Sequence, residues 1–252
     1  MRLDQQRLVI TGAAGGIGRA TARRAVAEGA QVLLTDREAE PLERVCVELG
    51  EAAQWLAGDL LEPAFCDSLA EQAASRLNGL DGVINNAGII TRGNVLATRD
   101  ADWRASFAIN VDAVFRICRS AIAWLTTQRQ AGVIVNVASC WGLYPGPDHL
   151  AYCTTKAAVA AMTRCLGRDH APDRIRVNAV APNEVDTPML RSGFEIRGLN
   201  VDTAVSELDA SVPLGRIATP DDIADVIVFL CSDQSRYVCG SVIEVNGAKP
   251  VG

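Results

Sequence analysis

The sequence predicts an α/β fold, in which a mostly parallel seven-stranded sheet carries helices on both faces. Short continuous apolar runs, typical of strands buried on both sides, alternate with segments of helical composition along the chain. A glycine cluster at 12–18 separates the first such strand from the first helix. The 252 residues, 49% hydrophobic and 21% charged, are sufficient for a single domain over 1–252 with a substantial core.

The elements follow one another in a regular order. Strands are expected at 7–11, 31–36, 82–86, 132–139, 174–180 and 241–245, and a further short apolar run ends at Asp59. Helices are expected at 19–28, 38–49, 64–77, 100–113, 114–130, 151–169 and 220–232, and a mobile loop-helix segment at 189–214 is expected to cover the site. Ligands bind such sheets beyond the carboxyl ends of the strands. The residues placed on that rim are Gly12, Asp36, Asp59, Asn86, Ser139 and Pro182.

The glycine segment 12–18 links a strand to a helix, which is the arrangement of a dinucleotide-binding turn. Glycines permit the tight turn and the close approach of a diphosphate, and the helix N-terminus offers free N–H groups. Asp36 ends the next strand, where its carboxylate can accept hydrogen bonds from the ribose of NAD and would repel the 2′-phosphate of NADP. Arg37 is the counter-argument, because its guanidinium could hold that phosphate. The pattern predicts NAD rather than NADP.

Tyr152 and Lys156 lie about one helical turn apart, so both project from one helix face. A tyrosine pKa of about 10 makes a poor base at neutral pH, but a nearby ammonium favours the phenolate and lowers that pKa. The pair is therefore a candidate acid/base group, although this spacing alone also fits a surface tyrosine beside a solvated lysine. Ser139 ends a buried strand 13 residues earlier, and it could bind the same substrate oxygen or serve as a helix cap.

Taken in order, these segments resemble the short-chain dehydrogenase/reductase family. The matching pieces, between about Leu8 and Val245, are 11–18, Asp59 with Leu60, 85–88, Asn110, Ser139, and Tyr152 with Lys156. The resemblance implies a doubly wound Rossmann-type domain that transfers a hydride between nicotinamide and a secondary alcohol or ketone. It implies that Tyr152 is the general base or acid, that Ser139 binds the reacting oxygen, and that Lys156 also holds the nicotinamide ribose. Asn110 would order a proton-relaying water, with a purely structural asparagine as the alternative.

The turn and the resemblance together imply a set of cofactor-binding residues: Gly12, Ala14, Gly15, Gly16, Ile17, Gly18, Asp36, Arg37, Asp59, Leu60, Asn86, Ala87, Gly88, Tyr152, Lys156, Pro182, Val185 and Thr187. One position departs from the family, which usually has glycine where Asn183 stands. Asparagine tolerates a positive φ better than most residues, so the loop is expected to survive the change.

The substrate-binding residues are expected to be Ser139, Trp141, His149, Tyr152, Asn183 and Glu184. Their mixed chemistry favours a polar substrate such as a sugar, polyol or cyclic alcohol. An anionic substrate bound by Arg191 or Arg197 is the alternative, and His149 also fits a structural, hydrogen-bonded role. Two other functions stay open: an NAD-binding sensor or scaffold without catalysis, and an NAD-assisted epimerase or lyase.

Composition excludes several classes of partner. The formal net charge is −6 and no basic block occurs, so nucleic acid and anionic membrane are not expected partners. Neither a spanning apolar run nor a signal-peptide core is evident, which predicts a cytoplasmic protein. The eight cysteines form no CxxC pair, so no metal site is expected, and only Cys140 and Cys153 flank proposed catalytic residues. The resemblance also implies a homotetramer, built through helices near 100–130 and 150–169 and the last strand.

Overall fold

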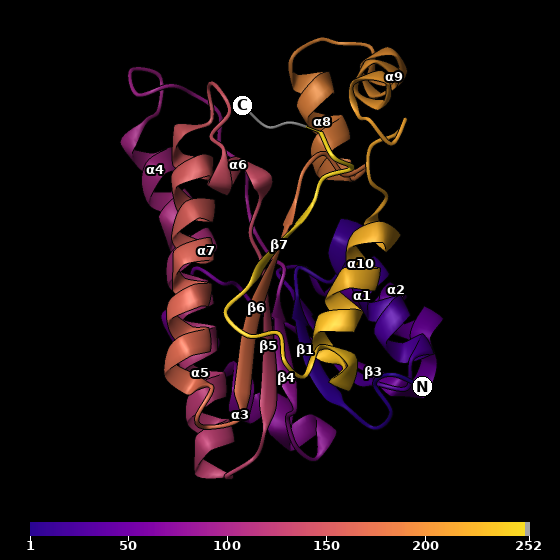
Figure 1. Cartoon of the computed structure of the whole chain (residues 1–252), viewed down its shortest axis with the longest axis vertical. Helices are drawn as coiled ribbons and strands as arrows, with labels where there is room; N and C mark the ends of the chain where they lie inside the picture. Colours follow the sequence, from indigo (N-terminus) through magenta and orange to yellow (C-terminus); the bar gives the residue numbers. More distant parts are fainter. Residues whose placement is uncertain (250–252) are drawn as a thin grey trace.

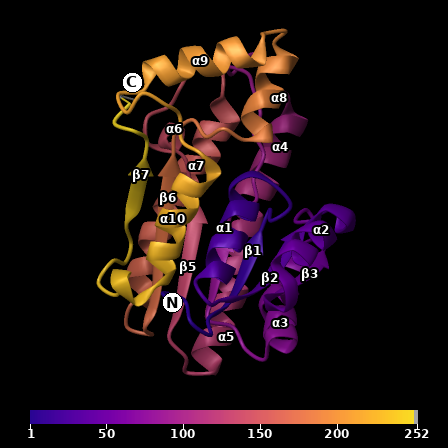
Figure 2. The ribbon, with the colours of Figure 1, turned by 90° about the vertical axis from the view of Figure 1, so that its right-hand side faces the viewer.

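A computed structural model describes residues 1–249 and contains a seven-stranded sheet in the order β3-β2-β1-β4-β5-β6-β7. Every neighbouring pair is parallel, and the two edges of the sheet are seen in Figure 2. The strands are β1 (Arg7–Thr11), β2 (Gln31–Asp36), β3 (Ala53–Ala57), β4 (Gly82–Asn85), β5 (Gly132–Val137), β6 (Ile175–Pro182) and β7 (Val242–Val245). The predicted fold class is confirmed. Strand order reverses between β1 and β4, which is where such sheets bind ligands.

Helices cover both faces of the sheet. One face carries α1 (Gly16–Ala27), α2 (Ala39–Leu49) and α10 (Pro220–Cys231), and the other carries α3 (Pro63–Leu77), α5 (Ala113–Thr127) and α7 (Leu150–His170). The shorter helices are α4 (Asp100–Phe107), α6 (Cys140–Leu143), α8 (Pro188–Ile196) and α9 (Val201–Ser211). Short 3-10 turns occur at Gly50–Ala52 and Asp233–Ser235, and a π-helical turn at Ala108–Asp112 joins α4 to α5.

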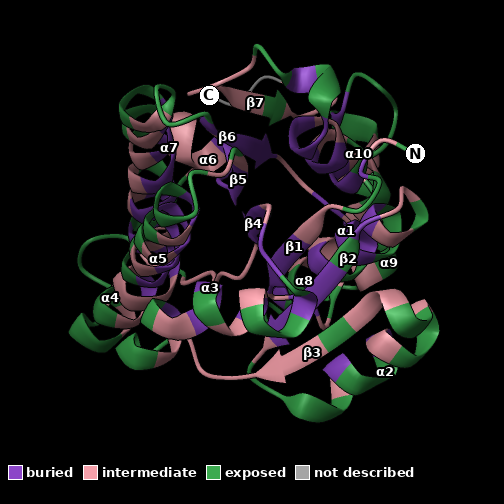
Figure 3. Cartoon of the chain, turned by 90° about the horizontal axis from the view of Figure 1, so that it is seen from below, coloured by how far each residue is buried: buried purple, intermediate pink, exposed green. Residues whose placement is uncertain are grey.

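The core consists of two apolar layers, one on each side of the sheet. Side chains alternate along a strand, so Leu8 and Ile10 of β1 pack toward α1 while Val9 packs toward α3 and α5. All three are fully buried. Figure 3 shows the buried strands in the middle of the molecule and exposed residues on the outer sides of the helices. The continuous apolar runs in the sequence therefore reflect burial on both faces.

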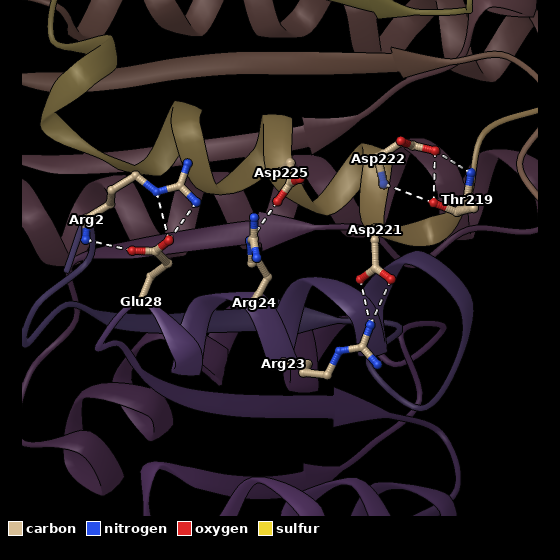
Figure 4. A network of polar contacts seen from close by, with 8 residues as sticks. All are labelled: Arg2, Arg23, Arg24, Glu28, Thr219, Asp221, Asp222 and Asp225. Carbon is tan, nitrogen blue, oxygen red and sulfur yellow. Dashed lines mark hydrogen bonds and ion pairs between the residues drawn. The ribbon is translucent and has the colours of Figure 1, made fainter. Parts of the chain in front are cut away.

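Ion pairs join α1 to α10 along their exposed edges (Figure 4). They connect Arg23 with Asp221 and Arg24 with Asp225, each at 2.6 Å. Exposed pairs of this kind contribute about 0–1 kcal/mol each, so they orient the helices more than they stabilise the fold. Because α1 begins at the glycine turn, this packing helps to fix the position of that turn.

The segment expected as a mobile cover forms two helices, α8 and α9, above the carboxyl ends of the strands (Figure 1). The Thr187 hydroxyl caps α8 by accepting from the Leu190 amide at 3.3 Å. The Asn200 side chain caps α9 by accepting from the Thr203 amide at 3.0 Å. These caps explain why the segment forms helices instead of an irregular loop.

Within residues 1–249, no helix has both the length and the apolar character needed to cross a bilayer. The same part of the chain brings together no trio of His, Cys, Asp or Glu side chains suited to hold a metal ion. All eight cysteines are free thiols.

Candidate active site

A cavity of about 690 Å³ lies at the carboxyl ends of the central strands. This size is within the usual range for small-molecule and cofactor sites. The glycine turn lines this cavity together with Ser139, Tyr152 and Lys156. Of the eighteen residues expected to bind a cofactor, every one except Gly18 lines it, from Gly12 to Thr187. The fold therefore brings residues as far apart in sequence as Gly12 and Thr187 into one cavity.

Asn86 holds the glycine turn against the end of β4. Its Nδ2 donates to the carbonyl oxygens of Thr11 and Gly12, both at 3.0 Å. Gly12 has a φ of +65°, and a Cβ there would stand 2.8 Å from the Cα of Ala87. Only glycine meets both requirements at this position. The Asn86 side chain thus has a structural task, alongside any contact with a ligand.

Gly18 does not line the cavity, and its contact with the cofactor stays a prediction. It is buried in the first turns of α1, where a Cβ would overlap the carbonyl oxygen of Gly12. Gly18 therefore permits close packing of the helix beneath the turn. Gly15 is the opposite case, because it lines the cavity and a Cβ there would meet nothing within 4 Å.

Asp36 connects β2 to the glycine turn. One carboxylate oxygen accepts from the Ala14 amide at 3.1 Å, and the other accepts from the Arg37 amide at 2.8 Å. The Arg37 guanidinium is exposed and donates to Glu38 at 3.3 Å. Glu38 thus partly neutralises the charge of Arg37, which weakens the case that Arg37 binds the 2′-phosphate of NADP.

Tyr152 and Lys156 both extend from α7 into the cavity, next to Ser139 at the end of β5. The Ser139 hydroxyl also caps the short helix α6 by accepting from the Trp141 amide at 3.2 Å, so the cap and the site roles coexist. Lys156 is only 5% exposed, and its Nζ donates to the carbonyl oxygen of Val137 at 2.8 Å.

Burial governs the protonation of both groups. Desolvation lowers the pKa of Lys156 to about 8. Desolvation also raises the pKa of Tyr152, and a hydrogen bond with Ser139 opposes that rise. The expected lowering of the tyrosine pKa by Lys156 is therefore not found in the protein alone. The cation lies 5.9 Å from the centre of the ring, and burial is the largest cause of the shift in the tyrosine pKa.

Asn110 lies behind the cavity wall, in the π-helical turn, and is 1% exposed. Its side chain accepts from the Ile89 amide at 2.9 Å and donates to the Ile89 carbonyl at 2.9 Å and to Thr155 at 3.1 Å. These contacts fasten the loop after β4 to α7. They favour a positioning role for Asn110, and its part in a proton relay stays a prediction.

The expected substrate residues divide between the cavity and its surroundings. Trp141, Asn183 and Glu184 line the cavity, as do Ser139 and Tyr152. His149 does not; its ring packs edge-on against Trp141 at 4.6 Å, and its Nδ1 lies 2.8 Å from the Pro147 carbonyl. These contacts fit the structural, hydrogen-bonded role that the sequence also allowed for His149, and its contact with substrate stays a prediction.

Asn183 and Glu184 lie in the loop after β6. Asn183 is not among the residues with positive φ, so the loop needs no left-handed conformation there. Glu184 forms a half-buried ion pair with Lys249 at 2.9 Å. One atom of each side chain, Asn183 Nδ2 and Glu184 Oε2, is buried and has no hydrogen-bond partner among residues 1–249.

Sequence reasoning missed part of the lining. The cavity also includes Ile89, Ile90, Arg92, Met189 and Leu190. The first three lie within four residues after the 85–88 segment, and this closeness in sequence is the signal that could have indicated them. Met189 and Leu190 belong to the start of α8, whose placement depends on how the cover folds.

The cysteines beside the site are poorly suited to reaction. Cys140 and Cys153 are buried, and neither lines the cavity. Burial raises the pKa of Cys140 to about 12 and also raises that of Cys153, so little reactive thiolate is present. Cys140 donates to the Ala181 carbonyl at 3.0 Å, which fits a packing role.

Comparisons with known proteins identify the family of the chain. Residues 12–247 match a family model described as enoyl-(acyl carrier protein) reductase. The chain is 35% identical to the 3-oxoacyl-(acyl-carrier-protein) reductase FabG of Thermotoga maritima, with 98% of each covered. It is also 35% identical to meso-2,3-butanediol dehydrogenase of Serratia marcescens, over 98% of this chain and 95% of that one.

A solved structure, the 3-ketoacyl-(acyl-carrier-protein) reductase of Brucella melitensis complexed with NADH, superposes with a TM-score of 0.88. It is 33% identical, and the match covers 98% of this chain and 99% of that one. The match covers nearly the whole chain, including the sheet, the glycine turn and the Tyr152 helix. The chain therefore belongs to the short-chain dehydrogenase/reductase family, whose members named here are oxidoreductases.

Proposed function

We propose that this protein is an NAD-dependent dehydrogenase that transfers a hydride between a secondary alcohol or ketone and nicotinamide. One observation carries the proposal: Ser139, Tyr152 and Lys156 line the same cavity as the glycine turn and Asp36. A proton-transfer group and a dinucleotide site are thus adjacent, and oxidation of an alcohol requires both. The relatives support the reaction class, since the two named above act as a reductase and a dehydrogenase.

The lining suits a dinucleotide. Gly15 leaves open space where a side chain would stand, at the N-terminus of α1. A helix N-terminus with bare backbone favours a diphosphate. Gly88 lines the cavity near Lys156. A Cβ there would stand 3.2 Å from Asn110 Oδ1 and 3.3 Å from Lys156 Nζ, so glycine avoids crowding these two side chains. When bound, nicotinamide supplies the hydride acceptor or donor.

The residues of the chain handle the proton. In oxidation, Tyr152 acts as the phenolate and accepts the hydroxyl proton of the substrate, and in reduction the phenol donates that proton back. Ser139 hydrogen-bonds the same oxygen and holds it beside Tyr152. Lys156, held by the Val137 carbonyl, supplies positive charge and binds the cofactor ribose. Asn110 positions the loop that carries Gly88 and Ile89.

NAD is proposed over NADP because of Asp36. Its carboxylate lines the cavity, where it can accept from ribose hydroxyls and would repel a 2′-phosphate. Arg37, the residue that could favour NADP, is paired with Glu38. The solved reductase of Brucella melitensis, which was crystallised with NADH, supports the same choice for this chain.

The first test is a screen of secondary alcohols, including sugars, polyols and cyclic alcohols, for formation of reduced cofactor with NAD and with NADP. Production of NADH that depends on one alcohol class supports the proposal. Tight NAD binding by calorimetry with no turnover of any alcohol or ketone would point to a sensor or scaffold. Conversion of a substrate without net NADH would point to an epimerase or lyase.

A further inference from the structure

We propose that Arg92 and Arg197 form an anion-binding subsite beside the catalytic cavity, and that the substrate is a small secondary alcohol or ketone carrying a carboxylate. The inference rests on the proposed dehydrogenase function and specifies its substrate class. It replaces the uncharged polyol as the favoured substrate.

Arg92 and Arg197 are both exposed, and each approaches Gly193 on α8 from a different side. Arg92 lines the cavity from the loop after β4, and its Nη2 occupies the place where a Cβ of residue 193 would stand. Arg197 donates from Nε to the Gly193 carbonyl at 3.0 Å and lies over the ring of Phe194. Gly193 is buried and has no positive φ, so its lack of a side chain makes room for Arg92 without any need for an unusual backbone.

The charge of these two arginines is not neutralised within residues 1–249, where neither forms a salt bridge with a carboxylate. Their neighbour Arg191 differs, because Asp186 holds it with contacts of 2.6 and 2.8 Å. Arg191 is therefore a structural pair. Of the two arginines considered from the sequence, only Arg197 has charge available for a ligand.

His149 lies within reach of the same positive charge. Burial lowers its pKa, and the charges of Arg92 and Arg197 lower it further, while the Pro147 carbonyl and Asp148 act in the opposite direction. The Pro147 carbonyl can only accept, so Nδ1 carries the proton and Nε2 is left as the acceptor. Asp148 is the one acidic group that acts on His149, and it is exposed. Two cations and one carboxylate therefore act on His149.

The loop that carries Arg92 is fixed relative to the catalytic helix. The Gly93 amide donates to the Asp148 carbonyl at 2.6 Å, and the Leu150 amide donates to the Gly93 carbonyl at 3.1 Å. Leu150 begins α7, which carries Tyr152. The backbone beside Arg92 is thus held at a set position relative to α7, as a subsite that orients a substrate requires.

The chemistry of the subsite favours a carboxylate. Guanidinium groups present planar donor pairs that match carboxylate oxygens, and two of them bind one such group more strongly than a lone cation would. The cavity of about 690 Å³ must also hold the dinucleotide, so the remaining room favours a small hydroxy or keto acid.

The test compares matched substrates: cyclic and linear secondary alcohols, each as the carboxylic acid and as its carboxamide, at low salt. Wild type should have a kcat/KM at least ~10-fold higher for the acid, as one charge-assisted interaction supplies. Arg92→Gln/Arg197→Gln should lose about 10–100-fold in kcat/KM for the acid, mainly through KM, and stay within about 2-fold for the amide.

Two further variants separate the subsite from general charge and from folding. Arg76→Gln/Arg129→Gln removes two exposed arginines near the amino ends of β4 and β5 and changes net charge equally, so it should keep the preference for the acid. Gly193→Ala keeps net charge but displaces the Arg92 guanidinium, so it should reduce the preference. Equal turnover of acid and amide by wild type, or equal loss of both in the double variant, would overturn the subsite.

If the protein oxidises none of these alcohols, the subsite can still be tested by measuring binding. Calorimetry with NAD-saturated protein should show cyclohexanecarboxylate binding at least ~10-fold tighter than cyclohexanecarboxamide, with the difference lost in Arg92→Gln/Arg197→Gln. No difference would overturn the subsite whatever the activity. A clear difference without oxidation of any hydroxy acid would leave the subsite standing and count against the dehydrogenase function.

Discussion

The Nζ of Lys156 lies 5.9 Å from the centre of the Tyr152 ring and donates to the carbonyl oxygen of Val137 at 2.8 Å. The two residues therefore share a face of α7 and a cavity, but the lysine is anchored to β5. Its charge is held in place by a backbone dipole in a desolvated setting. The packing of α7 against the sheet sets the distance between the two groups. The role of each residue can therefore be tested by replacing one while the other stays in place.

Replacing Tyr152 with phenylalanine should remove turnover and leave cofactor binding intact. The variant keeps the ring that packs in the cavity and loses only the hydroxyl that exchanges a proton. We expect kcat to fall about 10²–10⁴-fold, the range for loss of a general acid or base. NAD affinity, measured by calorimetry, should stay within about 2-fold. Near-normal kcat would remove Tyr152 from the chemistry, and Ser139→Ala is the comparison that tests the neighbouring hydroxyl.

Replacing Lys156 with methionine should abolish activity without loss of stability at neutral pH. Burial lowers the lysine pKa from 10.5 to about 8, so the unfolded chain holds this proton more tightly than the folded one. The sign follows: charged Lys156 opposes folding below pH 8, by roughly 3 kcal/mol, and this cost disappears as pH rises toward 10.5.

Thermal unfolding at several pH values checks this prediction. The Tm of Lys156→Met should equal or exceed that of wild type at pH 7, although the bond to Val137 is lost. Wild type should then gain on the variant between about pH 8 and 10. A difference in Tm that stays constant over that range would contradict the assignment of the shift to Lys156.

Replacing Asp36 with asparagine should narrow the preference for NAD over NADP. The amide preserves the size of the side chain and can still accept from the Ala14 amide, which Asp36 contacts at 3.1 Å. It removes the charge that repels a 2′-phosphate. We expect the ratio of kcat/KM values to fall about 10-fold or more, the effect of one charge-assisted contact. Arg37→Gln is the control, and an unchanged ratio in the asparagine variant would shift the decision to Arg37.

The sequence was sufficient to predict the fold and many of the residues that line the cavity. Strands buried on both faces read as apolar runs, and the positions of Gly12 and Asp36 follow from the order of elements. Those features are local in sequence, so local patterns reveal them. The oligomeric state stays a prediction.

The substrate side was less accessible because it depends on contacts between distant loops. Arg92 reaches the cavity only because Gly193, about a hundred residues later, leaves room for its guanidinium. The neutralisation of Arg191 by Asp186 likewise depends on how α8 begins. The sequence left two roles open for His149, and its packing against Trp141 favours the structural one. The pKa of Tyr152 is raised and not lowered, because its largest cause is burial, which a spacing pattern does not report.

Two glycines of the same turn should respond to alanine in opposite ways. A Cβ on Gly18 would overlap the Gly12 carbonyl oxygen, and the surrounding backbone cannot move aside cheaply. Gly18→Ala should therefore cost about 1–3 kcal/mol through overpacking, which corresponds to a Tm lower by roughly 2–12 °C for a chain of this size. Gly15 has an extended φ of −154° and open space around its Cβ position, so Gly15→Ala should fold as wild type does. Its methyl group would instead enter the space proposed for the diphosphate and weaken NAD binding about 10-fold or more, as a steric loss of 1–2 kcal/mol would do.

Thermal unfolding without cofactor and NAD calorimetry on both variants test whether Gly18 serves packing and Gly15 serves cofactor binding. Equal loss of stability in the two would mean that Gly15 also serves packing, and unchanged NAD affinity in Gly15→Ala would place the diphosphate elsewhere.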